Sequence, residues 1–207
     1  MSEKFIYSDQ EHIFALRTMN KFLAGHKGFV AGGCFKNLFS GERPKDVDVF
    51  FRSQNDWNAA AEALGKDSDF EPAYTSENVV GYRHIASNTN LELVRTIFGS
   101  PEEIISQFDF TVAKFAYYSE TEEDESGVAQ LVYKAVYHPK FFEHLHLKRL
   151  IIDDKIPKPM STLNRVVKYV KYGFTPCTET KLKLVNALRR LPENEVLLPT
   201  NFYDGWD

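Results

Sequence analysis

The sequence predicts an α+β fold: a mixed β-sheet flanked by helices, followed by a small helical C-terminal subdomain. Segments such as residues 46–52 (DVDVFFR) alternate between polar and apolar residues, which is typical of strands. Segments with apolar residues at helical spacing lie between them. From Pro139 onward only helical patterns follow. We therefore divide the chain into residues 1–138 and 139–207.

The elements of the first part follow one another in a regular order. Apolar residues at helical spacing predict a helix over residues 9–24, and the apolar run 28–31 predicts a buried strand that ends at Gly32 and Gly33. A Ser-Asn-Thr-Asn turn at 87–90 joins two strands into a hairpin. The other predicted elements are helix 34–40, strand 46–52, helix 55–64, strands 77–86 and 90–98, a helix from Ser100 to Ile105 with Ser at its cap, the apolar segment 108–118 and strand 129–137.

Two further predictions concern the surface and the helical part. Five acidic residues within 120–125 predict a solvated loop. Helices are predicted over residues 140–150, 161–173 and 178–191, and the last dozen residues look irregular. In the second of these helices, an apolar stripe is expected to pack on the first part of the chain; it consists of Leu163, Val166, Val167 and Val170.

Composition limits the classes of function. The 25 Lys and Arg against 29 Asp and Glu give a net charge of −4, which argues against a uniformly basic nucleic-acid coat protein. Residues 140–190 nevertheless hold 12 Lys and Arg against 4 Asp and Glu, a flank suited to a polyphosphate. Two cysteines are too few for a disulfide framework and indicate a reducing, cytoplasmic compartment. No apolar run approaches 18 residues, so we expect no membrane span.

Two aspartates on one strand are the first candidate site residues. Strand alternation places Asp46 and Asp48 on one face, while Val47 and Val49 point to the other face and enter the core. The two carboxylates repel each other unless a divalent cation lies between them, and hard oxygen ligands suit Mg²⁺ or Mn²⁺. Such ions can hold the attacking and leaving oxygens of a phosphoryl transfer. Solvated aspartates at a strand edge are the alternative.

A Gly-Gly pair precedes these aspartates. Gly32 and Gly33 lie between a strand and a helix, where backbone N–H groups can approach a phosphate closely. Either feature alone has a plain structural explanation, a tight turn or exposed carboxylates. Their combination over residues 29–51 favours a nucleotide site.

This stretch, with Gly32-Gly33, Gly41 and Pro44-Lys45-Asp46-Val47-Asp48, resembles the head-domain signature of the polymerase-β-type nucleotidyltransferases. It is most similar to the branch of CCA-adding enzymes and poly(A) polymerases. The resemblance implies that Gly32 and Gly33 bind the triphosphate, and that Asp46 and Asp48 bind the catalytic metals. Lys36-Asn37 stands where that branch has Arg-Asp, which keeps a cation for the phosphates and loses a carboxylate. We assign Lys36 and Lys45 to nucleotide binding.

The resemblance also implies a third carboxylate on a neighbouring antiparallel strand. Glu92 meets this description, with Leu91 and Leu93 facing the core; a solvated glutamate is the alternative. Asp109, in the phrase Phe-Asp-Phe-Thr, resembles a motif that shapes the ribose site of the CCA-adding branch. Asp109 is also a candidate cap for the following turn and the reserve third metal ligand.

The basic face of the helix over 161–173 completes the candidate site. It resembles the Arg-rich helix that follows the head in the CCA-adding branch and ends in Gly-Phe, as Gly173-Phe174 does here. The resemblance implies nucleotide contacts for Arg165 and Lys168. A solvated basic helix face is the alternative reading of these residues.

Together these patterns predict an enzyme: a compact, phage- or toxin-like nucleotidyltransferase that uses Mg²⁺ or Mn²⁺. It would transfer an NMP from an NTP, such as ATP, to an acceptor hydroxyl and release pyrophosphate. Only about 70 residues follow the head. The acceptor is therefore left open between the 3′ end of an RNA, such as tRNA, and a protein or small molecule. A catalytically silent nucleotide-binding module with the same fold is the alternative. The preferred NTP and the oligomeric state are also left open.

Overall fold

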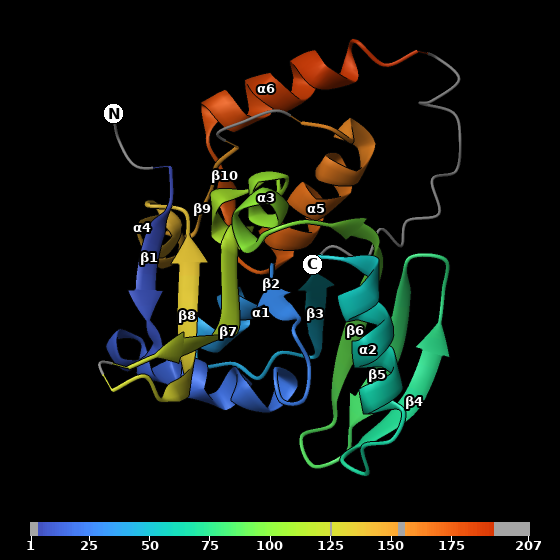
Figure 1. The fold of residues 1–207 in the computed structure, drawn as a ribbon. Coiled ribbons are helices and arrows are strands. Elements are labelled where there is room, and N and C mark those ends of the chain that lie inside the picture. The colour runs from blue at the N-terminus through green and yellow to red at the C-terminus, as the bar shows by residue number, and fades with distance from the viewer. Residues whose placement is uncertain (1–3, 125, 153–155, 193–207) are drawn as a thin grey trace.

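The computed structural model describes residues 4–124, 126–152 and 156–192, which form a mixed sheet flanked by helices (Figure 1). Its strands are β1 (Ile6–Asp9), β2 (Phe29–Ala31), β3 (Asp46–Phe51), β4 (Phe70–Thr75), β5 (Val79–His84), β6 (Thr89–Phe98), β7 (Phe115–Glu123) and β8 (Ala129–Tyr137). The strand order is β1-β8-β7-β2-β3-β6-β5-β4, so β1 and β4 are the two edges. Neighbours are antiparallel except for the central pair β3 and β6. The predicted fold class is confirmed.

The N-terminal helical segment differs in type from the prediction for residues 9–24. It consists of two 3₁₀ segments, η1 (Gln10–His12) and η2 (Phe14–Phe22). In η2, Leu16, Met19 and Phe22 are buried, and a spacing of three residues is the period of a 3₁₀ helix. The other helices are α1 (Cys34–Phe39), α2 (Gln54–Leu64), α3 (Pro101–Ser106), η3 (Thr111–Ala113), α4 (Phe141–His146), α5 (Pro159–Lys171) and α6 (Thr178–Leu188).

Each face of the sheet contributes to a separate hydrophobic cluster. In β3, Val47, Val49 and Phe51 pack on one face together with residues of η2, α1 and α2. Phe50 packs on the opposite face, with residues of α3. Residues of α4 and α5 belong to the first cluster, so the core is continuous across residue 138. The boundary between residues 1–138 and 139–207 stays a prediction, and residues 193–207, which include all of the predicted irregular end, lie outside the described residues.

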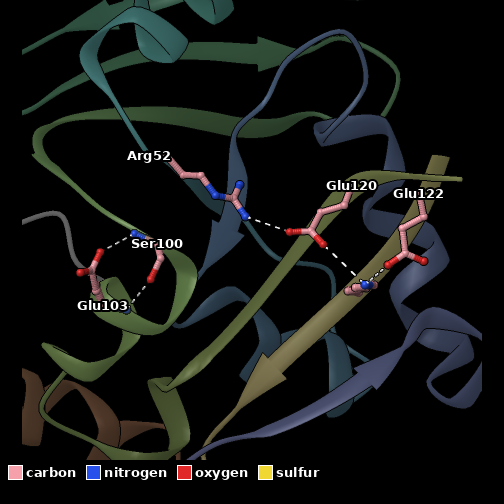
Figure 2. A network of polar contacts seen from close by, with 6 residues as sticks. Arg52, Ser100, Glu103, Glu120 and Glu122 are labelled. Carbon is pink, nitrogen blue, oxygen red and sulfur yellow. Dashed lines mark hydrogen bonds and ion pairs between the residues drawn. The ribbon is translucent and has the colours of Figure 1, made fainter. Parts of the chain in front are cut away.

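Most of the acidic run predicted as a loop is part of a strand, because β7 extends through Glu123; residue 125 lies outside the described residues. Glu120 and Glu122 lie two residues apart, on the same side of β7, and both pair with Lys134 of β8 (Figure 2). Arg52 also pairs with Glu120 at 3.2 Å. Cations on neighbouring segments thus allow an acidic sequence to continue as a strand.

The helix over residues 161–173 is confirmed as α5, but its predicted apolar stripe packs only in part, through Val166. Val167 and Val170 are exposed, whereas Thr162 and Tyr169 are buried. The helix instead packs through the face that carries Tyr169, whose ring contacts that of Phe110. Figure 1 shows α5 and α6 together beyond one end of the sheet strands. Within the described ranges, no helix has the length and apolarity needed to cross a membrane.

Candidate nucleotide-binding site

Three carboxylates meet on the central strands. In the register of β3 and β6, Asp48 lies opposite Glu92 and Asp46 lies opposite Asn90. Leu91 is fully buried on the other face, which confirms the predicted orientation of Glu92. The prediction of an antiparallel neighbour was wrong, because β3 and β6 run parallel. The chain between them contains α2 and the strands β4 and β5, and such a crossover is what a parallel pair requires.

Hydrogen bonds link these carboxylates to their neighbours. Asn90 donates to Asp46 Oδ1 at 2.9 Å, and the Tyr74 hydroxyl donates to Glu92 Oε1. The carboxyl groups of Asp48 and Glu92 are close enough to affect the pKa of each other. Burial raises the pKa of Asp48 well above its usual range, and the negative charges of Glu92 and Asp46 raise it further. Burial also raises the pKa of Glu92.

This group of carboxylates fits a hard divalent cation. Mg²⁺ is commonly bound by one or two carboxylates, with water and substrate phosphates as the other ligands. Asp48 and Glu92 are side by side, and Asp46 lies two positions earlier on β3. Within residues 4–124, 126–152 and 156–192, no three His, Cys, Asp or Glu side chains are grouped closely enough to hold a metal ion by themselves. Mg²⁺ or Mn²⁺ at Asp46, Asp48 and Glu92 would therefore need further ligands from a substrate.

The Gly-Gly turn and Asp48 line one pocket. Gly32 follows β2 with a φ of +99°, a conformation that glycine adopts readily, and Gly33 precedes α1. The pocket has a volume of about 290 Å³. Five residues that the sequence assigned to the site line it: Gly32, Gly33, Asp48, Asp109 and Arg165. Its other lining residues are Phe50, Thr96, Ile97, Gln107, Phe108, Phe110, Ala113, Pro157, Lys158 and Tyr169.

Asp109 and Arg165 are paired with each other. The Nε and Nη2 atoms of Arg165 lie 2.9 and 2.8 Å from Asp109 Oδ2, and the Asp109 side chain is only 5% exposed. No side chain caps η3, so the capping role considered for Asp109 is not seen. Because Asp109 is held by Arg165, Glu92 is the third carboxylate that the structure places beside Asp48. The ion pair joins α5 to the segment before η3.

The three candidate lysines occupy different surroundings. Lys168 of α5 lies close enough to Asp46, Asp48 and Glu92 for their charges to favour its protonated form, although burial lowers its pKa. Lys36 is buried, with Nζ 4.2 Å from the centre of the Tyr172 ring, and is not among the residues lining the pocket. The Lys45 side chain is exposed, and its main-chain carbonyl accepts a hydrogen bond from Asn90. The structure thus brings Lys168, but neither Lys36 nor Lys45, to the carboxylates or the pocket.

Sequence reasoning missed two residues of the site, Tyr74 and Asn90. Each donates a hydrogen bond to a carboxylate assigned to the site. Asn90 could have been found, because the predicted strand 90–98 runs beside that of Asp46. Tyr74 lies on β4, which the hydrophobic pattern did not reveal.

The fold is that of a nucleotidyltransferase head. A CCA-adding enzyme in complex with CTP superposes with a TM-score of 0.59 at 13% identity, covering 89% of this chain and 45% of that one. A complex of a CCA-adding enzyme with ATP gives 0.59 at 12% identity, over 92% and 49%. The Thermotoga maritima CCA-adding enzyme, solved with tRNA, gives 0.54 at 12% identity, over 89% and 46%. The fold implied by the sequence resemblance is confirmed.

The chain belongs to the Gabija anti-defense 2 family, whose sequence profile matches residues 4–148. A curated relative, Gabija anti-defense 2 of Bacillus phage SPbetaL7, is 24% identical over 172 residues. The match covers 83% of this chain and 38% of that protein. The chain therefore spans well under half of this relative and about half of the solved structures that it matches.

Proposed function

We propose that this chain is a metal-dependent nucleotidyltransferase, which transfers an NMP from an NTP to an acceptor hydroxyl and releases pyrophosphate. The observation that carries the proposal is the pairing of Asp48 with Glu92 on adjacent strands, because Asp48 lines a pocket together with Gly32 and Gly33. Carboxylates brought together on adjacent strands suit a divalent cation, which would offset the repulsion between their charges. The same residue types, in the same order along the chain, carry the sequence resemblance.

Each group has a definite task in this proposal. Asp46 and Asp48, with Glu92, would hold Mg²⁺ or Mn²⁺, and the bound metal would supply charge neutralisation at the triphosphate. Glu92 would accept the proton of the acceptor hydroxyl. Lys168, which is within reach of the charges of the three carboxylates, would add a positive charge beside the triphosphate. Gly32 and Gly33 line the pocket and have no side chains of their own, so their backbone would be open to the phosphates.

Arg165 and Asp109 are the proposed contacts for the sugar and base. Both line the pocket, and their ion pair keeps the guanidinium at its wall. Arg165 has donors in addition to the two that Asp109 accepts, and these would be available to a nucleotide. The solved neighbours include CCA-adding enzymes with CTP, ATP and tRNA. By analogy, the acceptor of this chain would be the 3′ end of an RNA such as tRNA, or a hydroxyl of a protein that acts in Gabija defence.

One experiment tests the reaction and identifies the acceptor. The chain is incubated with each α-labelled NTP in turn, with Mg²⁺ or Mn²⁺, and with total RNA and protein of a bacterial host. We expect a labelled species that depends on the metal. Asp48→Asn should abolish the label, whereas Asp69→Asn, the same change at an exposed residue outside the site, should leave it intact. Absence of label with all four NTPs, from a chain that is folded, would refute the proposal.

A silent nucleotide-binding module remains a second candidate. Two observations favour it. The described residues contain no group of three side chains that could hold a metal ion, and the Tyr74 hydroxyl already donates a hydrogen bond to Glu92. Such a module would be stabilised by NTP and Mg²⁺, by about 2.7 kcal/mol at 100 times the dissociation constant, without transfer to any acceptor. Thermal unfolding with and without each NTP separates the two candidates, because only the enzyme also yields a labelled product.

A further inference from the structure

Tyr74 stands at the end of a row of residues that leads to the proposed catalytic centre. Across the strands, Tyr74 of β4 lies opposite Gly81 of β5, and Gly81 lies opposite Glu92 of β6. Glu92 in turn lies opposite Asp48 of β3. The four residues therefore occupy one line across four adjacent strands, on the same face of the sheet.

Two local features place the Tyr74 ring on this face. The register between β4 and β5 shifts between Pro72 and Tyr74, so that Ala73 is an extra residue in the strand. Without this bulge, Ala73 would lie opposite Gly81 and Tyr74 would point to the other face. The ring then lies over Gly81, where an added Cβ would come within 2.7 Å of the Tyr74 Cε1 and Cζ atoms. A side chain at position 81 would therefore exclude the ring from its present place.

The Tyr74 hydroxyl lies where the hydroxyl of an acceptor substrate would have to bind in the proposed reaction. It donates a hydrogen bond to Glu92 Oε1, and Glu92 lies opposite Asp48 in the register of β6 and β3. In the proposed mechanism, Glu92 is the group that accepts the proton of the acceptor hydroxyl. The Tyr74 side chain is also accessible, with 41% of the residue exposed. A phenolic hydroxyl of the chain itself thus occupies the position of an acceptor.

We propose that Tyr74 is a site of self-modification, at which the chain attaches an NMP to its own phenolic oxygen. This inference rests on the proposed nucleotidyltransferase function. In the step, Tyr74 Oη attacks the α-phosphorus of the bound NTP, and the bond from that phosphorus to the oxygen bridging to the β-phosphate breaks. Pyrophosphate leaves, and the phenolic proton passes to Glu92. The product is a phosphodiester between Tyr74 Oη and the nucleoside 5′ position.

Two properties of the reaction follow from the hydrogen bond between Tyr74 and Glu92. The reaction is intramolecular, so the fraction of chain labelled at a given time should not depend on protein concentration. The attached NMP would remain beside Asp48, so incorporation should stop at one NMP per chain. These properties distinguish modification at Tyr74 from adventitious labelling of exposed hydroxyls.

The test uses the purified chain with each α-labelled NTP and Mg²⁺ or Mn²⁺, with no added acceptor. Label on the protein is followed by gel and intact mass, and the modified residue is mapped by peptide mass spectrometry. We compare Tyr74→Phe with Tyr7→Phe, which makes the same change on β1 at the opposite edge of the sheet. The melting temperature of each variant shows that it is folded. We expect label on the wild-type chain and on Tyr7→Phe, and none on Tyr74→Phe.

A mixing experiment tests the intramolecular step. Asp48→Asn, which retains Tyr74, is incubated with Tyr74→Phe, which retains the carboxylates, and neither should be labelled. Label on Asp48→Asn in the mixture, or on a residue other than Tyr74 in the wild type, would overturn the inference. Label that appears on added RNA or protein but never on the chain would overturn the inference and leave the proposed function intact. Absence of both transfer and NTP-dependent stabilisation would overturn the proposed function itself.

Discussion

The ion pair between Asp109 and Arg165 allows a quantitative test of how α5 is held on the sheet. Asp109 is 5% exposed, and two nitrogens of Arg165 lie within 2.9 Å of one of its oxygens. Arg165→Met keeps most of the aliphatic volume and removes the charge, so that a buried carboxylate is left without its cation. Breaking a buried pair in this way costs about 3–5 kcal/mol. Because the Arg165 side chain is 17% exposed, we expect about 3 kcal/mol.

Chemical and thermal unfolding measure this loss. For a chain of this size, each kcal/mol lowers the melting temperature by roughly 2–4 °C, so Arg165→Met should melt about 6–12 °C below the wild type. The double variant with Asp109→Asn should recover part of the loss, since the unpaired charge is gone. The exposed pair of Lys140 and Glu143 is the control, and its double-mutant cycle should show no coupling. A change within about 0.5 kcal/mol for Arg165→Met, typical of surface substitutions, would refute the reasoning.

Three further predictions concern charge, pH and packing. Asp48→Asn should abolish transfer with an unchanged or higher melting temperature, because burial and Glu92 disfavour the Asp48 carboxylate; a clear loss of stability would contradict this. Burial lowers the pKa of His26 from 6.5 to about 4, so the unfolded chain binds a proton that the folded chain does not. The free energy of unfolding should therefore fall by up to about 3 kcal/mol as the pH drops from 6.5 to 4. Unfolding curves of His26→Gln should lack this contribution. An equal dependence of the free energy of unfolding on pH in His26→Gln and the wild type would disprove it. Gly28→Ala would bring a Cβ within 2.5 Å of Val49 Cγ1, so urea unfolding should show a loss of about 1–3 kcal/mol, and wild-type stability would speak against this packing.

The central strand could be predicted because its pattern has a single period. Alternation along β3 sends Val47 and Val49 to one cluster and leaves Asp48 on the other face, as expected from residues two apart. The helix from Ser100 could be predicted as well, because its first residues have the sequence of a capping box, which Ser100 and Glu103 form in the structure (Figure 2). In both cases neighbours in sequence determine the structure.

Strand β4 could not be predicted in the same way. Five of its six residues are exposed, so it lacks an alternating apolar pattern. Pro72 is unfavourable inside a sheet and is accommodated here because β4 is an edge strand. The bulge at Ala73 also breaks the period of two. Tyr74 was missed for these reasons, although its contact with Glu92 places it in the site.

Local sequence patterns could not predict which side chains the candidate site residues contact in the folded chain. Asp109 and Arg165 were each recognised from their surroundings, but they lie 56 positions apart and nothing in either segment indicates that they bind one another. Lys36 was assigned to phosphate from its place after the glycines. In the folded chain it is buried against the Tyr172 ring, which belongs to a segment more than a hundred residues later.

The parallel pairing of β3 with β6 has a consequence for how the chain acquires its site. Asp46 and Asn90 are 44 positions apart, so closing this contact costs chain entropy that a hairpin such as β5–β6 does not. Contacts of long sequence separation slow folding, and parallel pairs are among them. On a nascent or refolding chain, β5 and β6 can pair before β3 joins them. The pair of Asp48 and Glu92 would then form only after the centre of the sheet has closed, so the candidate site is among the last parts of the sheet to assemble.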